Sequence, residues 1–455
     1  MEPENMGKEI PVVTVERGVE LGPVKIMNAV NNGPKMKPSD QTRGNFDEYA
    51  ALEIPYARIH DAAHCHSYGG CHTVDISCIF PDFSRDADDG SAYDFALTDE
   101  YLSTMRAAGT EPFFRLGQSI EHWKRKYGVN PPADFDKWAS VCEHVVRHFN
   151  DGWADGHHWN IRYWEIWNEP DLGPRADGRP SPTWTGTKEQ FFRLYSTTAL
   201  RLKSAHPGLM IGGPALAGCY GWTDDFLDHV KENGIPLDFF SWHKYAVSPE
   251  DIAECCRWVA GRLAGHGFDK TESILNEWNY VRGWTEEWVY SLRVESGDLS
   301  YKGAAFIASV MSICQRMPLD MLMFYDARVD CAMNNLFDFL TMEPMRAYYP
   351  FFAWARLRRL GTEVGLAVEN AKDIYGTAAI SGDGHLGMLL TRYNDDDNVS
   401  APVNVSVRLP GFKAGALSCH VTDETRMFTQ VPLSLRDGGE FSLSMKPNSF
   451  AYIEA

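Results

Sequence analysis

Short apolar runs alternate with longer amphipathic runs along the first 360 residues of the chain. The short runs are rich in β-branched and aromatic residues. Several are almost continuously apolar, which is typical of parallel strands covered on both faces. They predict eight strands, over residues 24–29, 56–60, 112–116, 162–167, 209–213, 238–243, 273–277 and 321–325.

Helical patterns lie between these strands. Apolar residues recur at three- and four-residue steps from Phe135 to Phe149, and Asp134 precedes them as a candidate N-cap. Similar patterns predict helices over residues 191–205, 226–230, 252–263, 303–314 and 348–360. Eight strands with intervening helices favour an α/β fold of the (β/α)8 TIM barrel type. A doubly wound open sheet is the alternative, although no glycine-rich phosphate turn follows the first strand.

After Leu360 the pattern changes to strict alternation of apolar and polar residues, interrupted by clusters of Asp and Gly. It predicts strands over residues 373–381, 386–394, 403–409, 417–421 and 441–454. We infer an accessory antiparallel β-sandwich domain. The predicted division is an N-terminal strand segment (1–17) that joins the β domain, a barrel (18–360) and the C-terminal β-sandwich domain (361–455). The aspartates at 395–397 are expected to form a solvated turn.

Composition and charge exclude several classes of protein. The 455 residues are 44% hydrophobic and carry a formal net charge of −19, which fits a globular protein and disfavours nucleic acid as a partner. No stretch approaches the roughly 18 apolar residues of a membrane span, so we expect no membrane partner. The first ten residues lack the features of a secretory signal. If the native chain begins at Met1, we expect a cytoplasmic protein with reduced cysteines.

Two predicted strands end in glutamates. The strand at 162–167 is followed by Asn168, Glu169 and Pro170, and the proline helps to end the strand there. The strand at 273–277 ends in Glu277, among aromatic residues. Because active sites of TIM barrels lie at the carboxyl ends of the strands, both glutamates are expected at one barrel mouth.

A pair of carboxyl groups in one site is what glycoside hydrolysis requires. One must carry a proton for the leaving oxygen, and the other must be ionised to attack the anomeric carbon. Carboxyl groups roughly 5–5.5 Å apart leave no room for an intervening water, which leads to a covalent intermediate and retained configuration. The alternative interpretation is that both glutamates are members of buried ion pairs.

Four segments carry a resemblance to a known family: residues 28–34, 58–61, 167–170 and 241–245. They resemble glycoside hydrolase family 39, the β-xylosidase and α-L-iduronidase family in the retaining (β/α)8 clan GH-A. The resemblance implies Glu169 as general acid/base, Glu277 as nucleophile and no cofactor. It also implies that Asn168 binds the sugar 2-hydroxyl, and that the sugar pocket is lined by His60, His243 and Tyr245.

Further candidate substrate-binding residues lie close to the predicted strand ends. Aromatic faces stack on sugars, so we select Trp123, Trp278, Tyr280 and Tyr325, although core packing is the alternative for any one tryptophan. Arg58 points to the same side of its strand as His60. It is either a partner of a catalytic carboxylate or an interior ion-pair partner of Glu165.

Three histidines and two cysteines lie between His64 and His72, at a spacing that fits no standard zinc motif. We interpret them as sugar-contacting or packed loop residues and predict no metal.

The predicted function is hydrolysis of a terminal glycosidic bond by a retaining exo-glycosidase, with β-D-xylosidase the first choice. The substrate is an oligosaccharide or glycoside. A homo-oligomer is implied only by the resemblance. The alternatives are another sugar specificity or endo action, a non-catalytic carbohydrate-binding barrel and a metallohydrolase.

Overall fold

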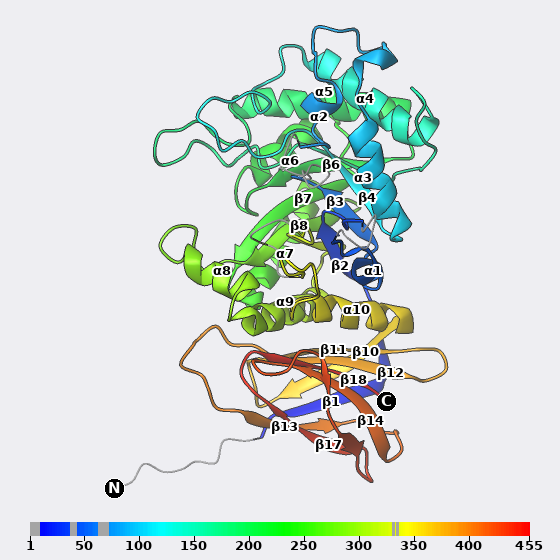
Figure 1. Ribbon diagram of the computed structural model, residues 1–455, viewed down its shortest axis with the longest axis vertical. Helices are drawn as coiled ribbons and strands as arrows, with labels where there is room; N and C mark the ends of the chain where they lie inside the picture. Colours follow the sequence, from blue (N-terminus) through cyan, green and yellow to red (C-terminus); the bar gives the residue numbers. More distant parts are fainter. Residues whose placement is uncertain (1–9, 37–42, 62–71, 330–332, 334–335) are drawn as a thin grey trace.

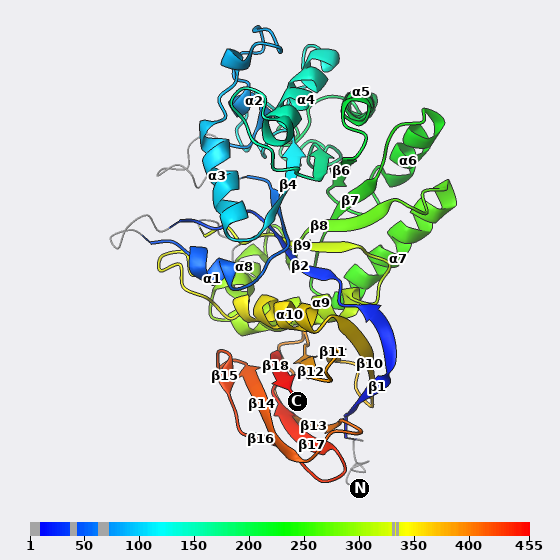
Figure 2. The ribbon, with the colours of Figure 1, turned by 90° about the vertical axis from the view of Figure 1, so that its right-hand side faces the viewer.

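The computed structural model describes residues 10–36, 43–61, 72–329, 333 and 336–455. Eight parallel strands close into a barrel in chain order, each hydrogen-bonded to the next and the last to the first (Figures 1 and 2). They are β2 (Ile26–Asn31), β3 (Tyr56–Ile59), β4 (Glu111–Leu116), β5 (Tyr163–Ile166), β6 (Met210–Leu216), β7 (Phe239–Ala246), β8 (Glu272–Tyr280) and β9 (Met321–Phe324). The predicted TIM barrel is therefore confirmed, and every predicted barrel strand overlaps an observed one.

Helices surround the barrel. Within the described residues they are α1 (Phe46–Ala50), α2 (Ile76–Ile79), α3 (Ala96–Ala107), α4 (Phe135–Asp151), α5 (Lys188–Ala205), α6 (Thr223–Glu232), α7 (Pro249–His266), α8 (Trp288–Ser296), α9 (Ser300–Cys314) and α10 (Tyr348–Leu360). Asp134 caps α4 as predicted, since its side chain accepts a hydrogen bond from the backbone N–H of Lys137 at 3.0 Å. None of the described helices is long and apolar enough to cross a lipid bilayer.

The remaining strands form one curled ten-stranded sheet below the barrel (Figure 1). They are β1 (Val12–Pro23), β10 (Thr362–Glu369), β11 (Ile374–Ile380), β12 (Leu386–Arg392), β13 (Val403–Arg408), β14 (Gly415–Thr422), β15 (Thr429–Gln430), β16 (Leu433–Leu435), β17 (Glu440–Met445) and β18 (Ser449–Glu454). All pairings are antiparallel except that of β1 with β13. The sheet is thus mixed, because the N-terminal strand inserts between β10 and β13.

One predicted β strand is in fact two. The run at 441–454 is divided between β17 and β18 by a turn containing Pro447 and Asn448. Proline has no N–H for the ladder, and Asn448 adopts a left-handed conformation with φ 56°. Apolar residues lie close to this short turn on both sides, so the pattern predicts a single strand.

The barrel and the sheet pack against each other through α9 and α10, which contact β11 and β12 (Figure 2). An ion-pair network lies at this junction. The buried Lys302 ammonium contacts Asp395 at 2.9 Å and Asp397 at 2.8 Å. The expected solvated turn at 395–397 is therefore partly an anchor, because its carboxylates neutralise a lysine that is 1% exposed.

The lower half of the barrel interior is filled by apolar side chains, here called the apolar layer. Its members come from six strands, and their rings stack and cross at centroid distances near 5 Å, as between Phe113 and Tyr163 (5.1 Å). They are Ala29, Phe113, Tyr163, Phe239, Ile274, Met321 and Met323. This layer closes the barrel floor, so any site must lie above it, toward the carboxyl ends of the strands.

Candidate active site

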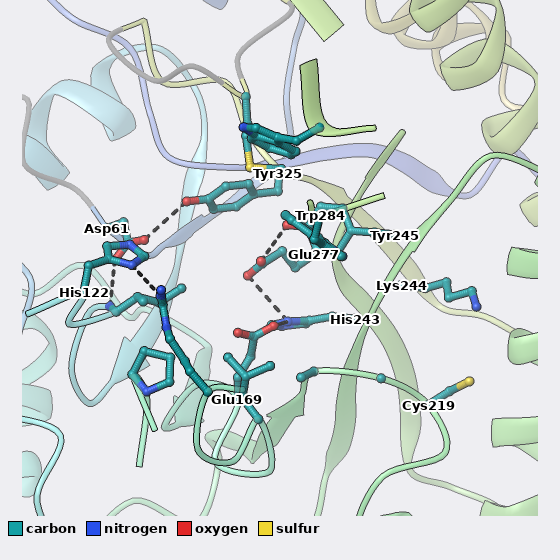
Figure 3. A pocket seen from close by; sticks show the side chains of 18 of the residues that line it. Asp61, His122, Glu169, Cys219, His243, Lys244, Tyr245, Glu277, Trp284 and Tyr325 are labelled. Carbon is teal, nitrogen blue, oxygen red and sulfur yellow. Dashed lines mark hydrogen bonds and ion pairs between the residues drawn. The ribbon is translucent and has the colours of Figure 1, made fainter. Parts of the chain in front are cut away.

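A cavity of about 720 Å³ opens at the carboxyl ends of the barrel strands (Figure 3). Acidic, basic and aromatic side chains line it together, which suits a polar ligand with apolar faces. The described lining residues include Asp61, Ile120, His122, Glu169, Leu172, Arg175, His243, Tyr245, Glu277, Trp284, Trp288, Tyr325 and Arg328.

The two predicted glutamates face each other across this cavity (Figure 3). One ligating oxygen of Glu169, one of Glu277 and one ring nitrogen of His243 all lie within 4.8 Å of one another. His243 Nδ1 is 2.8 Å from Glu169 Oε1 and 3.6 Å from Glu277 Oε2. Glu169 and Glu277 are 108 residues apart in the sequence (277 − 169), yet their carboxyl groups lie in the same part of the cavity.

Local backbone geometry presents Glu169 to the cavity. Trp167 and Glu169 adopt left-handed conformations, with φ 78° and 46°, that non-glycine residues rarely occupy. Hydrogen bonds hold this turn in place: Trp167 N–H donates to the Leu116 carbonyl (2.7 Å) and Glu169 N–H to the Ala215 carbonyl (2.8 Å). Such strained turns are concentrated at functional sites, where the surrounding structure maintains them.

Beneath the glutamates lies a hydrogen-bonded set of buried side chains, here called the polar layer: Asn31, Arg58, Glu165, Ser241 and Asn276. Arg58 is its centre. Its Nε donates to Glu165 (2.6 Å), Nη1 lies 3.3 Å from Glu277 Oε2, and Nη2 donates to Asn168 Oδ1 (2.6 Å). The two interpretations of Arg58 both hold, because its planar fork reaches the interior ion pair and Glu277 at once.

Glu165 also accepts hydrogen bonds from two other members of the polar layer. Its Oε1 accepts hydrogen bonds from Ser241 Oγ (2.6 Å) and Asn276 Nδ2 (2.5 Å). The buried Arg58–Glu165 pair therefore has the extra hydrogen bonds that a desolvated ion pair needs.

Burial raises the pKa of both Glu169 and Glu277 to about 7. Because the two pKa values are alike, the direct contacts of each carboxyl group indicate which of the two is ionised and which is protonated. Glu277 accepts a hydrogen bond from the Tyr245 hydroxyl at 2.7 Å and lies beside the Arg58 guanidinium, and both favour its ionised form. Glu169 contacts His243, whose pKa burial lowers to about 4, so this imidazole is neutral at pH 7. Glu169 is therefore the better holder of a proton.

Several buried polar atoms near the glutamates have no hydrogen-bond partner within the described residues. They are Asn168 Nδ2, His243 Nε2 and both ring nitrogens of His60. An unpaired buried polar group destabilises a protein by about 1–3 kcal/mol. A ligand rich in hydroxyl groups would satisfy such atoms.

The predicted aromatic residues have different positions. Tyr245 and Tyr325 line the cavity. Trp278 and Tyr280 are fully buried away from it, Trp278 against Phe324 and Tyr280 with its hydroxyl on Asp395. Asn276 and Glu277 both face the barrel interior, because the pairing register of β8 shifts between Leu275 and Trp278, and Trp278 then points outward.

Trp123 is 77% exposed and does not line the cavity, whereas Trp284 and Trp288 do and stack at 5.4 Å. Asp61 also lines the cavity and receives the Tyr325 hydroxyl at 3.3 Å. The position of Asp61 directly after the predicted strand at 56–60 is the sequence feature that could have identified it as a cavity residue. Trp284 lies in the loop after β8 and Trp288 is the first residue of α8, so neither follows a strand end directly.

The His64–His72 cluster lies outside the described residues except for His72. Within the described part, one metal-compatible group coincides with the active site, namely Glu169, His243 and Glu277.

Paired carboxyl groups at the mouth of a TIM barrel define the class of glycoside hydrolases. The family model for glycosyl hydrolases family 39 matches residues 62–326, more than half of the chain. The protein belongs to this family and is a glycosidase.

Named relatives agree with this family. A β-xylosidase of Caldicellulosiruptor saccharolyticus is 24% identical over 72% of this chain and 69% of its own. A β-xylosidase of Geobacillus stearothermophilus is 32% identical over 44% of each chain. The crystal structure of a glucosidase from Croceicoccus marinus superposes with a TM-score of 0.77 at 20% identity, covering 98% of this chain and 99% of the other. The last likeness concerns the fold alone.

Proposed function

We propose that the protein is a retaining exo-glycosidase that removes terminal β-D-xylosyl residues by double displacement. Glu277 attacks the anomeric carbon while protonated Glu169 donates its proton to the departing oxygen. Glu169, now ionised, takes a proton from water, and that water releases the sugar from Glu277. No cofactor takes part in either step.

The observation that carries the proposal is the short gap between the two carboxyl groups. Their nearest ligating oxygens lie within 4.8 Å, which resembles the roughly 5–5.5 Å separation of retaining enzymes and leaves no place for a water between them. An inverting enzyme needs about 6.5–9.5 Å.

The contacts of each glutamate support the division of roles. Arg58 and Tyr245 stabilise the anionic form of Glu277, as a nucleophile requires. Among the described residues, no such cation lies at hydrogen-bond distance from Glu169, which is held by a neutral imidazole. Asn168, oriented by Arg58 through its Oδ1, has its amide nitrogen free to donate to the sugar 2-hydroxyl.

Two findings support the substrate. The two relatives named above are β-xylosidases. The cavity of about 720 Å³ falls within the size range of small-molecule pockets, which suits a terminal sugar.

Trapping with 2,4-dinitrophenyl 2-deoxy-2-fluoro-β-D-xyloside tests the nucleophile. We expect mass spectrometry to find one added sugar, on the peptide that contains Glu277. An adduct on a different residue, or product released with inverted configuration in NMR, would refute the mechanism. A panel of nitrophenyl glycosides tests the sugar, and preference for a glucoside or arabinoside over the xyloside would replace the proposed substrate.

The acid/base role has its own test. Glu169→Ala should still form the intermediate from a substrate with a phenolic leaving group, and azide should restore turnover. The expected product is a β-xylosyl azide. An α-product would contradict the role of Glu169.

A further inference from the structure

A second group of metal-compatible side chains lies outside the cavity. Asp99 in the first turn of α3, His148 in the last turn of α4 and His157 in the following loop bring one ligand atom each within 4.8 Å of the others. His148 Nε2 is 2.9 Å from Asp99 Oδ1, and His157 Nε2 is 3.3 Å from the same oxygen. None of the three lines the active-site cavity.

The protonation of His148 is constrained by its second ring nitrogen. Its Nδ1 lies 3.0 Å from the Trp153 carbonyl oxygen, which can only accept, so Nδ1 carries the proton. In a neutral imidazole, Nε2 then presents a lone pair to the Asp99 carboxylate. A cation shared by both atoms removes this conflict. A carbonyl hydrogen-bonded to the far nitrogen is also the usual support of a metal-binding histidine.

His157 shows a similar need. Its Nε2 is buried and makes no hydrogen bond within the described residues, although it faces the same Asp99 oxygen. One carboxylate oxygen therefore lies between two imidazole nitrogens.

Two of the three ligand-atom separations are close to those of a tetrahedral ion, and the ligand atoms of the two histidines lie within 4.8 Å of each other. Zinc bonds of about 2.0–2.2 Å place neighbouring ligand atoms about 3.3 Å apart. The observed 2.9 and 3.3 Å separations need only small shifts to reach this geometry. The Asp99 and His157 side chains are 29% and 28% exposed, and a water molecule would complete the coordination of a four-coordinate ion.

The ligands are already held in position by their neighbours. The His148 ring stacks on Phe95 with centroids 3.5 Å apart, and the His157 ring on Trp159 at 3.8 Å. Gly156 brings the loop against α4, since a Cβ there would lie 2.1 Å from the His148 carbonyl oxygen. The last turn of a helix also carries a partial negative charge that favours a cation.

We propose that Asp99, His148 and His157 bind one divalent transition-metal ion, with zinc as the best fit, which clamps the loop at 152–160 to α3 and α4. The ion has a structural role and takes no part in hydrolysis. The site is assembled from two helices and a loop, and the sequence spacing of its ligands matches no standard zinc motif.

Zinc titration of the full chain, stripped with EDTA and dialysed free of chelator, tests the site in competition with a chromophoric chelator. We expect saturable binding of zinc and a higher Tm in its presence. Cobalt(II) should give the visible absorption bands of a tetrahedral complex. Wild-type protein that binds no zinc under these conditions would overturn the proposal.

Two variants and one control assign the binding to these residues. Asp99→Asn removes the shared carboxylate, and His157→Phe keeps the ring stacking while it removes the ligand. Each should weaken zinc binding at least about tenfold and abolish the zinc-dependent rise in Tm. Asp88→Asn disturbs the neighbouring pair with His144 (3.3 Å) and should bind zinc like the wild type. Equal affinity in the wild type and both ligand variants would refute the assignment.

The active-site group must be separated from this one, because its three ligand atoms also lie within 4.8 Å of one another. In a Glu277→Gln background, zinc binding at the proposed site should persist and should still be lost on addition of Asp99→Asn. Loss of all zinc binding in Glu277→Gln alone would place the ion in the active site and overturn the proposal.

Discussion

The two layers of the barrel interior differ completely in chemistry, although β2, β5, β7 and β8 contribute to both. In the apolar layer, rings and aliphatic groups fill the space without a charge. In the polar layer, every member is buried and hydrogen-bonded to another. On these four strands the change occurs within one step of two residues: Ala29 to Asn31, Tyr163 to Glu165, Phe239 to Ser241 and Ile274 to Asn276.

This difference shows how one barrel separates stability from chemistry. The apolar layer gains from burial and close packing, and it tolerates no ligand. The polar layer is stable only as a connected set, because each buried charge depends on its partners. It forms the floor of the active site and fixes the carboxyl groups above it. Substitutions in the two layers should therefore affect different measurements.

Glu277→Gln should have the largest effect on activity. The amide keeps the shape of the side chain but cannot form the glycosyl ester, so kcat on a nitrophenyl xyloside should fall by roughly 10⁴-fold or more. The Tm should stay equal or rise, because a buried carboxyl group is removed. Activity near that of the wild type would eliminate Glu277 as nucleophile.

Arg58→Met should reduce both stability and activity. It leaves Glu165 and Glu277 without their cation, and removal of one partner of a buried pair destabilises by about 3–5 kcal/mol. Chemical denaturation measures this loss. The double variant Arg58→Met with Glu165→Gln should recover part of the stability but not the activity. Wild-type stability in Arg58→Met would show that the polar layer is not a connected unit.

Phe113→Ala is the matched change in the apolar layer. The ring packs against Tyr163 and Phe239 with both centroids 5.1 Å away, and its loss should destabilise the fold by about 3–5 kcal/mol. The kcat measured well below the Tm should change little, because the cavity lies above this layer. A large fall in kcat with unchanged Tm would contradict the separation of the two layers.

Tyr245→Phe should give the smallest and most specific effect. The tyrosine hydroxyl donates to the ionised form of Glu277, so its loss raises the pKa of Glu277 above about 7. The rise of kcat/KM with pH, which reports ionisation of the nucleophile, should move to higher pH by about one unit. The stability should change little. An unchanged low-pH limb would show that Tyr245 does not control Glu277.

The pattern of apolar and polar residues predicts the barrel well, because each strand is a local run and its inward face follows a period of two. The same period places Glu165 and Arg58 in the interior. It does not place Trp278, because a register shift in β8 turns Glu277 inward and Trp278 outward, against the alternation set by Ile274 and Asn276. Proximity along a strand is a poor guide to proximity in space.

Contacts between residues that are far apart in the sequence cannot be predicted from local periodicity. Arg58 meets Glu165, Glu277 and Asn168 at once, and its strand position alone left two interpretations open. The cavity wall at Trp284 and Trp288 comes from the loop after β8 and the start of α8, and no periodicity describes the path of that loop. Asp99, His148 and His157 belong to this class as well, because two helices and a loop must pack before their ligand atoms meet.

The amino-acid sequence by itself determined the eight barrel strands, six of their covering helices, most of the appended β strands and the presence of two glutamates at strand ends. These depend on local periodicity and on turn residues, which act over a few positions. The tertiary structure alone decided which side chains share a hydrogen bond, which tryptophans face the cavity and how far apart the carboxyl groups lie. Such distances follow from barrel closure and loop paths, which bring together atoms that the order of residues leaves unrelated.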